Sequence, residues 1–169
     1  MKSIIHKLNF IPTLGFMLSL LVSVTSCEQQ NYEPNSNAAS GGGTKTTYKA
    51  YTLASSTGTT VYGRVVFYKY SASVTLVEMG LYNTTAGTSY SSSIYQGKLT
   101  TGSTTALKPL DTINGATGAF ATNKFFAINE SGFYDKLSTY DASVRVMVGP
   151  AVIASGNIGT NATPVAQAQ

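Results

Sequence analysis

The sequence predicts an all-β domain, a single antiparallel β-sandwich of about eight strands, behind an N-terminal targeting segment. Three observations support this prediction. From residue 44 onward Thr, Ser, Tyr, Val and Gly dominate and charged residues are sparse, as is typical of antiparallel sheets. Apolar and polar residues alternate in short runs that turn residues separate. No apolar pattern keeps a helical spacing for long, so a helical domain is not expected.

The N-terminal segment 1–26 has the features of a secretory signal. Lys2 and Lys7 precede an apolar run over 10–24, and small residues follow in the sequence VTSC at 24–27. The apolar run is about fifteen residues long and contains Pro and Gly, whereas a spanning helix needs roughly twenty apolar residues. We therefore expect this segment to be cleaved rather than kept as a transmembrane helix.

Residues 24–27 resemble the bacterial lipobox, in which the cysteine becomes the acylated amino terminus of the mature protein. Cys27 is the only cysteine, so no intramolecular disulfide can form and the lipobox accounts for its presence. We predict lipidation at Cys27 and attachment to the outer membrane, on its periplasmic or extracellular face. The polar segment 28–43 ends in three glycines, and we expect a flexible tether because it cannot bury a core.

The chain that follows should form one domain over 44–163, with a C-terminal tail at 164–169. Its turns are marked by residues that accept positive φ or bond their own backbone, such as Gly87, Asn114 and Gly132. The segment 134–140 is expected to contain a helical turn. We expect strands at 46–53, 59–70, 73–82, 89–96, 105–110, 118–128, 143–148 and 151–158. The second and third strands should meet in the core through two alternating sets, Val61, Gly63, Val65 and Phe67 on one and Thr75, Val77, Met79 and Leu81 on the other.

The charge of the mature chain is small. Removing Lys2 and Lys7 from the eleven Lys and Arg leaves nine, against seven Asp and Glu, a balance of +2. The remaining basic residues are spread singly, without a run or a stripe. Nucleic acid is therefore not an expected partner.

The absence of histidine restricts the chemistry further. His6 is the only histidine and lies in the predicted signal, so the mature protein would have no imidazole and, once acylated, no free thiol. Histidine-dependent triads, cysteine nucleophiles and the usual zinc, copper or iron sites need those groups. We expect no metal, no cofactor and no enzymatic activity.

Carboxylates leave one catalytic alternative open. An acid and base pair drawn from them would suit a small hydrolase acting on glycans. Asp135 and Asp141 lie six residues apart around the expected helical turn, but acids at such positions commonly cap turns and stay solvated. The acids of the expected domain are Glu78, Asp111, Glu130, Asp135 and Asp141.

Tyrosine is abundant, with eleven residues in the chain, and Trp is absent. On the second strand Tyr62 and Tyr68 fall on the face opposite Val65 and Phe67, with Arg64 between them. These tyrosines either pair across strands and stiffen a sheet or present an amphipathic surface to a glycan or protein ligand. On the second interpretation, Tyr62, Arg64 and Tyr68 are the candidate binding residues.

Several short segments, in order and spacing, resemble the chordin-type domain, called CHRD, which also occurs in secreted proteins and lipoproteins of Gram-negative bacteria. The resemblance covers most of the expected domain, from about residue 63 to 161. Its segments are Gly63-Arg64-Val65-Val66-Phe67, the alternating Val77, Met79 and Leu81, then Ile94, Gly97, Leu110, Asn114-Gly115 and Gly118, followed by Tyr134-Asp135-Lys136-Leu137, Val144, Val146 and Ala154-Ser155-Gly156-Asn157-Ile158-Gly159.

This resemblance implies a Greek-key sandwich similar to immunoglobulin-like domains and to copper-zinc superoxide dismutase. The family often has histidines where this chain has Ser93, Tyr95 and Met147, so a metal role does not carry over. The family brings no established enzymatic activity. Two hypotheses therefore stand: a membrane-anchored, surface-displayed structural or ligand-binding module, and a carboxylate-dependent hydrolase.

Overall fold

The structure of the chain is a computed structural model that describes residues 47–166. The predicted signal segment, Cys27 and the tether lie outside the described residues. The described residues all belong to one compact unit. Among them, no helix has the length and apolar character needed to cross a membrane.

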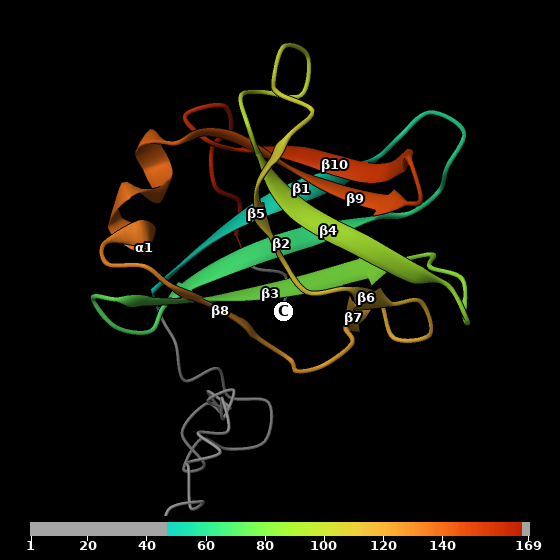
Figure 1. The fold of residues 1–169 in the computed structure, drawn as a ribbon, viewed down its shortest axis with the longest axis horizontal. Coiled ribbons are helices and arrows are strands. Elements are labelled where there is room, and N and C mark those ends of the chain that lie inside the picture. The colour runs from blue at the N-terminus through green and yellow to red at the C-terminus, as the bar shows by residue number, and fades with distance from the viewer. Residues whose placement is uncertain (1–46, 167–169) are drawn as a thin grey trace, which may run out of the picture. The chain divides into compact units, whose positions relative to one another are not determined.

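The fold is all-β, with antiparallel pairing throughout (Figure 1). One short helix, α1 (Phe133–Lys136), and the 3-10 turn η1 (Leu137–Thr139) follow each other between β8 and β9. The strands are β1 (Tyr48–Ser55), β2 (Tyr62–Lys69), β3 (Val74–Tyr82), β4 (Ser89–Gln96), β5 (Ala106–Pro109), β6 (Ile113–Asn114), β7 (Ala119–Phe120), β8 (Phe126–Asn129), β9 (Asp141–Val148) and β10 (Ala151–Gly159).

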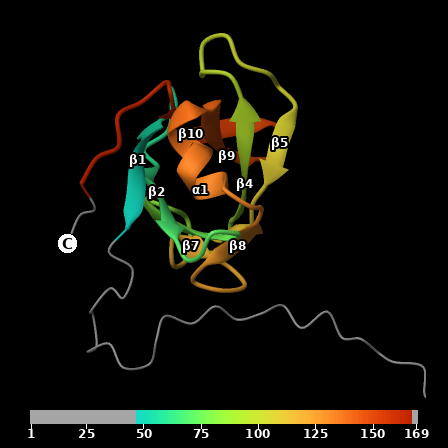
Figure 2. The same cartoon turned by 90° about the vertical axis from the view of Figure 1, so that its left-hand side faces the viewer.

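The strands form one curled sheet in the order β7-β6-β4-β9-β10-β1-β2-β3-β8, with β5 paired to β4. Seen from the end, the sheet closes almost completely around its core (Figure 2). Near one end the curl is completed by the backbone N–H of Leu81, which donates to the carbonyl of Gly118 at 2.8 Å. The β1-β2-β3-β8 half faces the β4-β9-β10 half across this core.

Alternation along β2 and β3 sets the inner and outer surfaces of the β1-β2-β3-β8 half. The eight residues predicted to meet in the core are all buried, which confirms the faces assigned from the sequence. β2 and β3 form a hairpin in which Val65 lies opposite Met79 and Phe67 opposite Val77. Apolar residues on the inner surface remove their area from water, and this burial is the main favourable contribution to folding.

Two glycines allow the sheet to curl. A Cβ on Gly63 of β2 would overlap the carbonyl oxygen of Gly80 on β3, and one on Gly156 of β10 would overlap the carbonyl oxygen of Thr52 on β1. Glycine within a strand often marks such a bend or a close backbone approach. The curvature of the sheet therefore depends on the missing side chains at these two positions.

The helical turn expected over 134–140 is confirmed as α1 and η1. It lies at one end of the curled sheet (Figures 1 and 2). Phe133, Tyr134 and Leu137 are buried and join the main core. The helical segment therefore covers this end of the core.

The strand predicted over 118–128 is wrong as a single element. It is divided into β7 and β8, because Ala121 donates to the carbonyl of Thr112 at 2.9 Å and Thr122 donates to the Asp111 carboxylate at 3.2 Å. These bonds hold the intervening residues beside the 111–112 segment instead of β3.

The short strand β6 was not predicted, since its two residues give no alternation to detect. The predicted tail at 164–169 contributes a bridge, in which Val165 donates to Ala50 at 2.8 Å.

Candidate ligand-binding face

The outer surface of β1, β2 and β3 carries the three binding candidates predicted from the sequence. Tyr62, Arg64 and Tyr68 all lie on β2 and all point away from the main core, on the side opposite Val65 and Phe67. The structure therefore brings them onto one face, but it gives them different surroundings. Tyr62 is exposed, Arg64 is half-buried, and Tyr68 is buried.

One half of this face is packed into a second hydrophobic cluster, which we call the packed half. Tyr68 is only 6% exposed. Its hydroxyl donates to the Glu78 carboxylate at 2.7 Å, and its ring meets Phe125 edge-on with 5.7 Å between centroids. The structure thus gives Tyr68 a structural role. The packed half comprises Ala50, Val66, Tyr68 and Leu76, with Tyr48, Tyr70, Val74, Phe125 and Ala127 against them.

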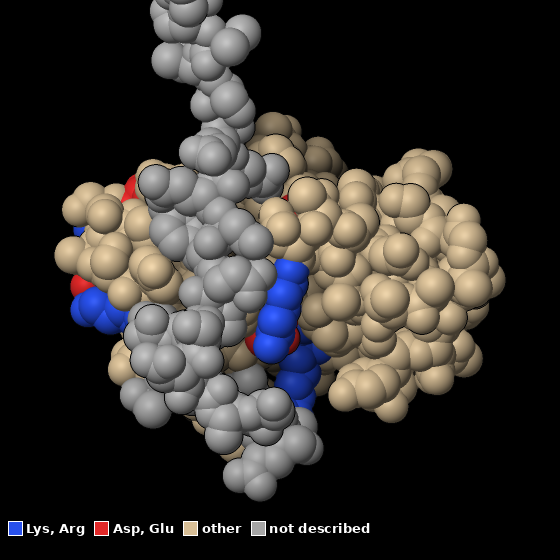
Figure 3. All heavy atoms as spheres, turned by 90° about the horizontal axis from the view of Figure 1, so that it is seen from below, with Lys and Arg blue, Asp and Glu red and all other residues tan. Residues whose placement is uncertain are grey.

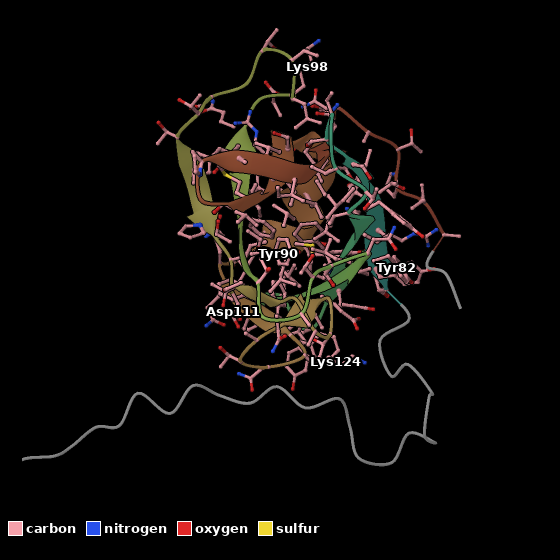
Figure 4. The ribbon with its side chains drawn as sticks, turned by 90° about the vertical axis from the view of Figure 1, so that its right-hand side faces the viewer. Tyr82, Tyr90, Lys98, Asp111 and Lys124 are labelled. Atoms are coloured by element: carbon pink, nitrogen blue, oxygen red, sulfur yellow. The ribbon has the colours of Figure 1, made fainter. Side chains whose placement is uncertain are left out.

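The other half is open and contains a pair of exposed tyrosines. Tyr62 on β2 lies directly opposite Tyr82 on β3. Their rings stack with 5.2 Å between centroids and 26° between planes. Tyr62 is 47% exposed and Tyr82 58% exposed, and Figure 4 places Tyr82 at the periphery of the sheet while Tyr90 lies inside it. Such exposure is notable because large aromatic side chains contribute strongly to binding surfaces.

A gap lies next to the tyrosine pair. Gly80 is exposed on β3 opposite Arg64 on β2, and a Cβ on Gly80 would have no atom of the described residues within 4 Å. Residues 78 and 82 flank it on the same face, about 13 Å apart along an extended strand. The surface is therefore lower at Gly80 than at Tyr82 and Glu78. We call Tyr62, Arg64, Gly80 and Tyr82 the open half.

Arg64 is the positive charge of the open half. Its Nη1 donates to the carbonyl oxygen of Ala166 at 2.7 Å. No carboxylate of the described residues forms an ion pair with it, whereas the carboxylate of Glu78 lies 3.7 Å from the ammonium of Lys124. Arg64 is thus held by a neutral acceptor. On the face seen from below in Figure 3, most of the visible described surface is neither basic nor acidic.

Tyr82 is the residue of the open half that reasoning from the sequence missed. The β2-β3 hairpin is centred on Ala72, since Lys69 pairs with Thr75. Counting outward from that centre puts Tyr62 opposite Tyr82. The signal was therefore present in the register of the hairpin, which the strand boundaries alone did not fix.

Ser93, Tyr95 and Met147 share another outer face, on β4 and β9. Tyr95 donates to the sulfur of Met147 at 3.4 Å, and the guanidinium carbon of Arg145 lies 4.5 Å from the centre of the Tyr95 ring. Ser93 lies opposite Arg145. The described residues contain no group of three His, Cys, Asp or Glu side chains that could hold a metal ion.

All five acids of residues 47–166 have partners in the fold. Asp111 accepts hydrogen bonds from the backbone of Thr112 and Thr122, and Asp141 accepts one from Asn161. The other three acids pair with lysines, as Lys124 with Glu78, Lys108 with Glu130 and Lys69 with Asp135. The contacts of Asp111 hold the loop at 111–122, and that of Asp141 lies at the start of β9, whereas Glu78 lies within β3 and Asp135 within α1.

Three tyrosines near the α1 end of the core have perturbed pKa values. Burial raises the pKa of Tyr51 above its usual 10.0, although the nearby backbone of Gly159 opposes this rise. Within residues 47–166, the Tyr51 hydroxyl has no hydrogen-bond partner. Burial also raises the pKa of Tyr134, with the charges of Tyr51 and Asp135 adding to it, and of Tyr140, with Glu130 adding to it. Tyr51 and Tyr134 belong to the main core, and Tyr140 packs against it.

Comparison with known protein families, with curated proteins and with solved structures finds no match for this chain.

Proposed function

We propose that this chain is a membrane-anchored, surface-displayed lipoprotein whose β domain is a non-catalytic ligand-binding module. The single observation that supports the binding role is the open half of the outer face. There, two stacked and exposed tyrosines lie beside a glycine gap and beside an arginine that pairs with no carboxylate of residues 47–166. An exposed aromatic pair next to a charged group offers contact area and a hydrogen-bonding group to a ligand.

The membrane anchor rests on sequence alone. The apolar segment, the lipobox-like residues and Cys27 support attachment to the outer membrane, on its periplasmic or extracellular face. Cys27→Ala tests the anchor: the variant should lose partitioning into detergent and should appear in the aqueous fraction. If the variant still fractionates with membranes and keeps an unchanged mature mass, the lipoprotein proposal is wrong.

A binding module is favoured over a carboxylate-dependent hydrolase by the partners of the acids. A hydrolase of that kind needs two carboxyl groups free to face a substrate. Each of the five acids within residues 47–166 instead bonds to a lysine, a tyrosine, an asparagine or the backbone. The acids therefore serve the fold, and the open half carries the binding role.

The Greek-key sandwich and the relation to chordin-type domains are part of this proposal. Two halves of the curled sheet that face each other across one core support the sandwich interpretation.

The binding role is tested with arrays of glycans and extracellular proteins. The mature lipidated protein, solubilised in a neutral detergent, should bind at least one class of probe. The double variant Tyr62→Ala/Tyr82→Ala should lose that binding, whereas Tyr95→Ala, on the other outer face, should keep it. Equal binding by both variants would place the site elsewhere, and binding to no probe would argue for a structural module.

A further inference from the structure

We infer that the open half recognises an acidic glycan, a polysaccharide with uronic acid units. A sugar ring would lie against Tyr62 and Tyr82 over Gly80, and its carboxylate would bond to Arg64. This inference rests on the proposed binding role of the face and names its ligand class. Its four residues come from the same two neighbouring strands.

The tyrosine pair supplies the apolar part of such a site. Tyr62 and Tyr82 stack on each other, and about half of each side chain remains exposed. Mutual stacking restricts both rings, so little side-chain entropy is left to lose when a ligand binds. The C–H groups of a sugar ring can pack on these aromatic surfaces while the hydroxyl groups stay in water.

Gly80 leaves room for the ring. A side chain there would lie between those of Tyr82 and Glu78 on β3, opposite Arg64 on β2. Its absence leaves open space on the outer face beside Tyr82. Glycine in a strand interior weakens the strand, and it often marks a place where a ligand approaches the backbone. The curl of the sheet does not explain this glycine, since a Cβ on Gly80 meets nothing.

Arg64 sets the charge of the ligand. Its guanidinium bonds to the neutral carbonyl of Ala166, and a carboxylate is a stronger acceptor for it, because guanidinium and carboxylate form charge-assisted bonds. The Glu78 carboxylate nearby is engaged by Tyr68 and Lys124. A ligand carboxylate would thus find its counter-charge at Arg64.

The topology favours a glycan over an extended peptide. Peptides that bind sheets commonly add a strand at an exposed edge, through main-chain hydrogen bonds. The open half is instead a face, because β2 is paired with β1 on one side and β3 on the other. On the outer edge of β3, β8 pairs only from Val74 to Val77, and beyond it the N–H of Leu81 is bonded to Gly118.

The test is calorimetric titration of the mature lipidated protein in neutral detergent with oligogalacturonate, oligomannuronate and hyaluronan fragments. Each acidic oligomer is compared with its methyl ester, which keeps the sugar backbone and removes the charge. The variants are Arg64→Gln and Tyr62→Ala/Tyr82→Ala. Arg145→Gln is the matched control, because this arginine stacks on Tyr95 on the other outer face.

We expect at least one acidic oligomer to bind, and Arg64→Gln to weaken it by about tenfold, the usual scale for losing one charged hydrogen bond. Methyl esterification should weaken binding to the wild type by a similar factor and add nothing to the loss in Arg64→Gln. The double tyrosine variant should abolish binding, and Arg145→Gln should leave it unchanged.

The inference is overturned if no acidic oligomer binds, or if Arg64→Gln and Arg145→Gln weaken binding equally. It is also overturned if the methyl ester binds as tightly as the acid. In that last case, loss of binding in the double tyrosine variant would keep the open half as the binding face and exclude only the acidic ligand class. A protein probe that binds through the tyrosines in the array experiment would have the same meaning. It would keep the open half as the binding face and exclude the acidic glycan as its ligand.

Discussion

The packed and open halves lie on the same face of the same two strands, yet their tyrosines have opposite surroundings. Tyr68 is 6% exposed, and its hydroxyl and ring both have partners, whereas Tyr62, six residues away on β2, is 47% exposed. Position in the alternation is therefore not what distinguishes an exposed tyrosine from a packed one. What distinguishes them is whether other elements reach that part of the face.

The reach of β8 and of the segment before it explains the difference. β8 pairs with β3 only from Val74 to Val77, and Phe125 packs on Tyr68 just outside that strand. Further along β3 no described strand pairs with its outer edge, and the backbone bond there is the one from Leu81 to Gly118. The tyrosine pair at the other end consequently faces outward.

The largest predicted effect is a difference in stability between alanine substitutions at two neighbouring glycines, one on β2 and one on β3. Gly63→Ala should destabilise the protein by about 3 kcal/mol or more, because the new Cβ overlaps the backbone of β3. Gly80→Ala is the matched control and should change stability by less than about 0.5 kcal/mol, as a surface substitution into open space. Thermal unfolding measures both. Equal losses in the two variants would contradict the assignment of Gly63 to curvature and Gly80 to the open face.

A second prediction compares tyrosines of the two halves. Tyr68→Ala should cost about 3 kcal/mol, since it removes a buried ring and leaves Glu78 without a hydrogen bond. Tyr62→Ala, which removes an exposed ring, should cost less than about 1 kcal/mol. Chemical denaturation of both variants checks this difference. A large loss in Tyr62→Ala would make the open half part of the structural framework.

The smallest predicted effect concerns alkaline pH and the core phenols. The folded-state pKa of Tyr51, Tyr134 and Tyr140 is raised above 10.0, so the folded state disfavours their ionised form. Their contribution to stability is complete below pH 10 and is lost as the pH rises above it. Denaturation at a series of pH values should show this decline.

Tyr51→Phe should reduce the alkaline decline without lowering stability at neutral pH, because the Tyr51 hydroxyl has no hydrogen-bond partner among the described residues to lose. Tyr62→Phe serves as the control and should keep the full decline, since it leaves the three core phenols in place. An unchanged decline in Tyr51→Phe would show that this phenol does not limit stability at high pH.

The sequence was informative where a local pattern decides the structure. Alternation placed the inner residues of β2 and β3 correctly, and it put Tyr62, Arg64 and Tyr68 on one face. It did not show that Phe125 would cover Tyr68, or that Asp111 would bond to Thr122 and interrupt the strand expected there. Those contacts join segments distant in the chain. The position of Tyr82 opposite Tyr62 is an intermediate case, because it follows from the register of the β2-β3 hairpin and not from alternation along one strand.

The most direct test of the difference between the halves is a map of backbone amide chemical shifts in the mature protein during titration with an acidic oligosaccharide. Shifts should concentrate at 62–64 and 80–82, and residues 66–68 and 75–77 in the packed half should stay largely unchanged. Shifts centred on the packed half, or on the face of Tyr95 and Arg145, would contradict the assignment of ligand binding to the open half.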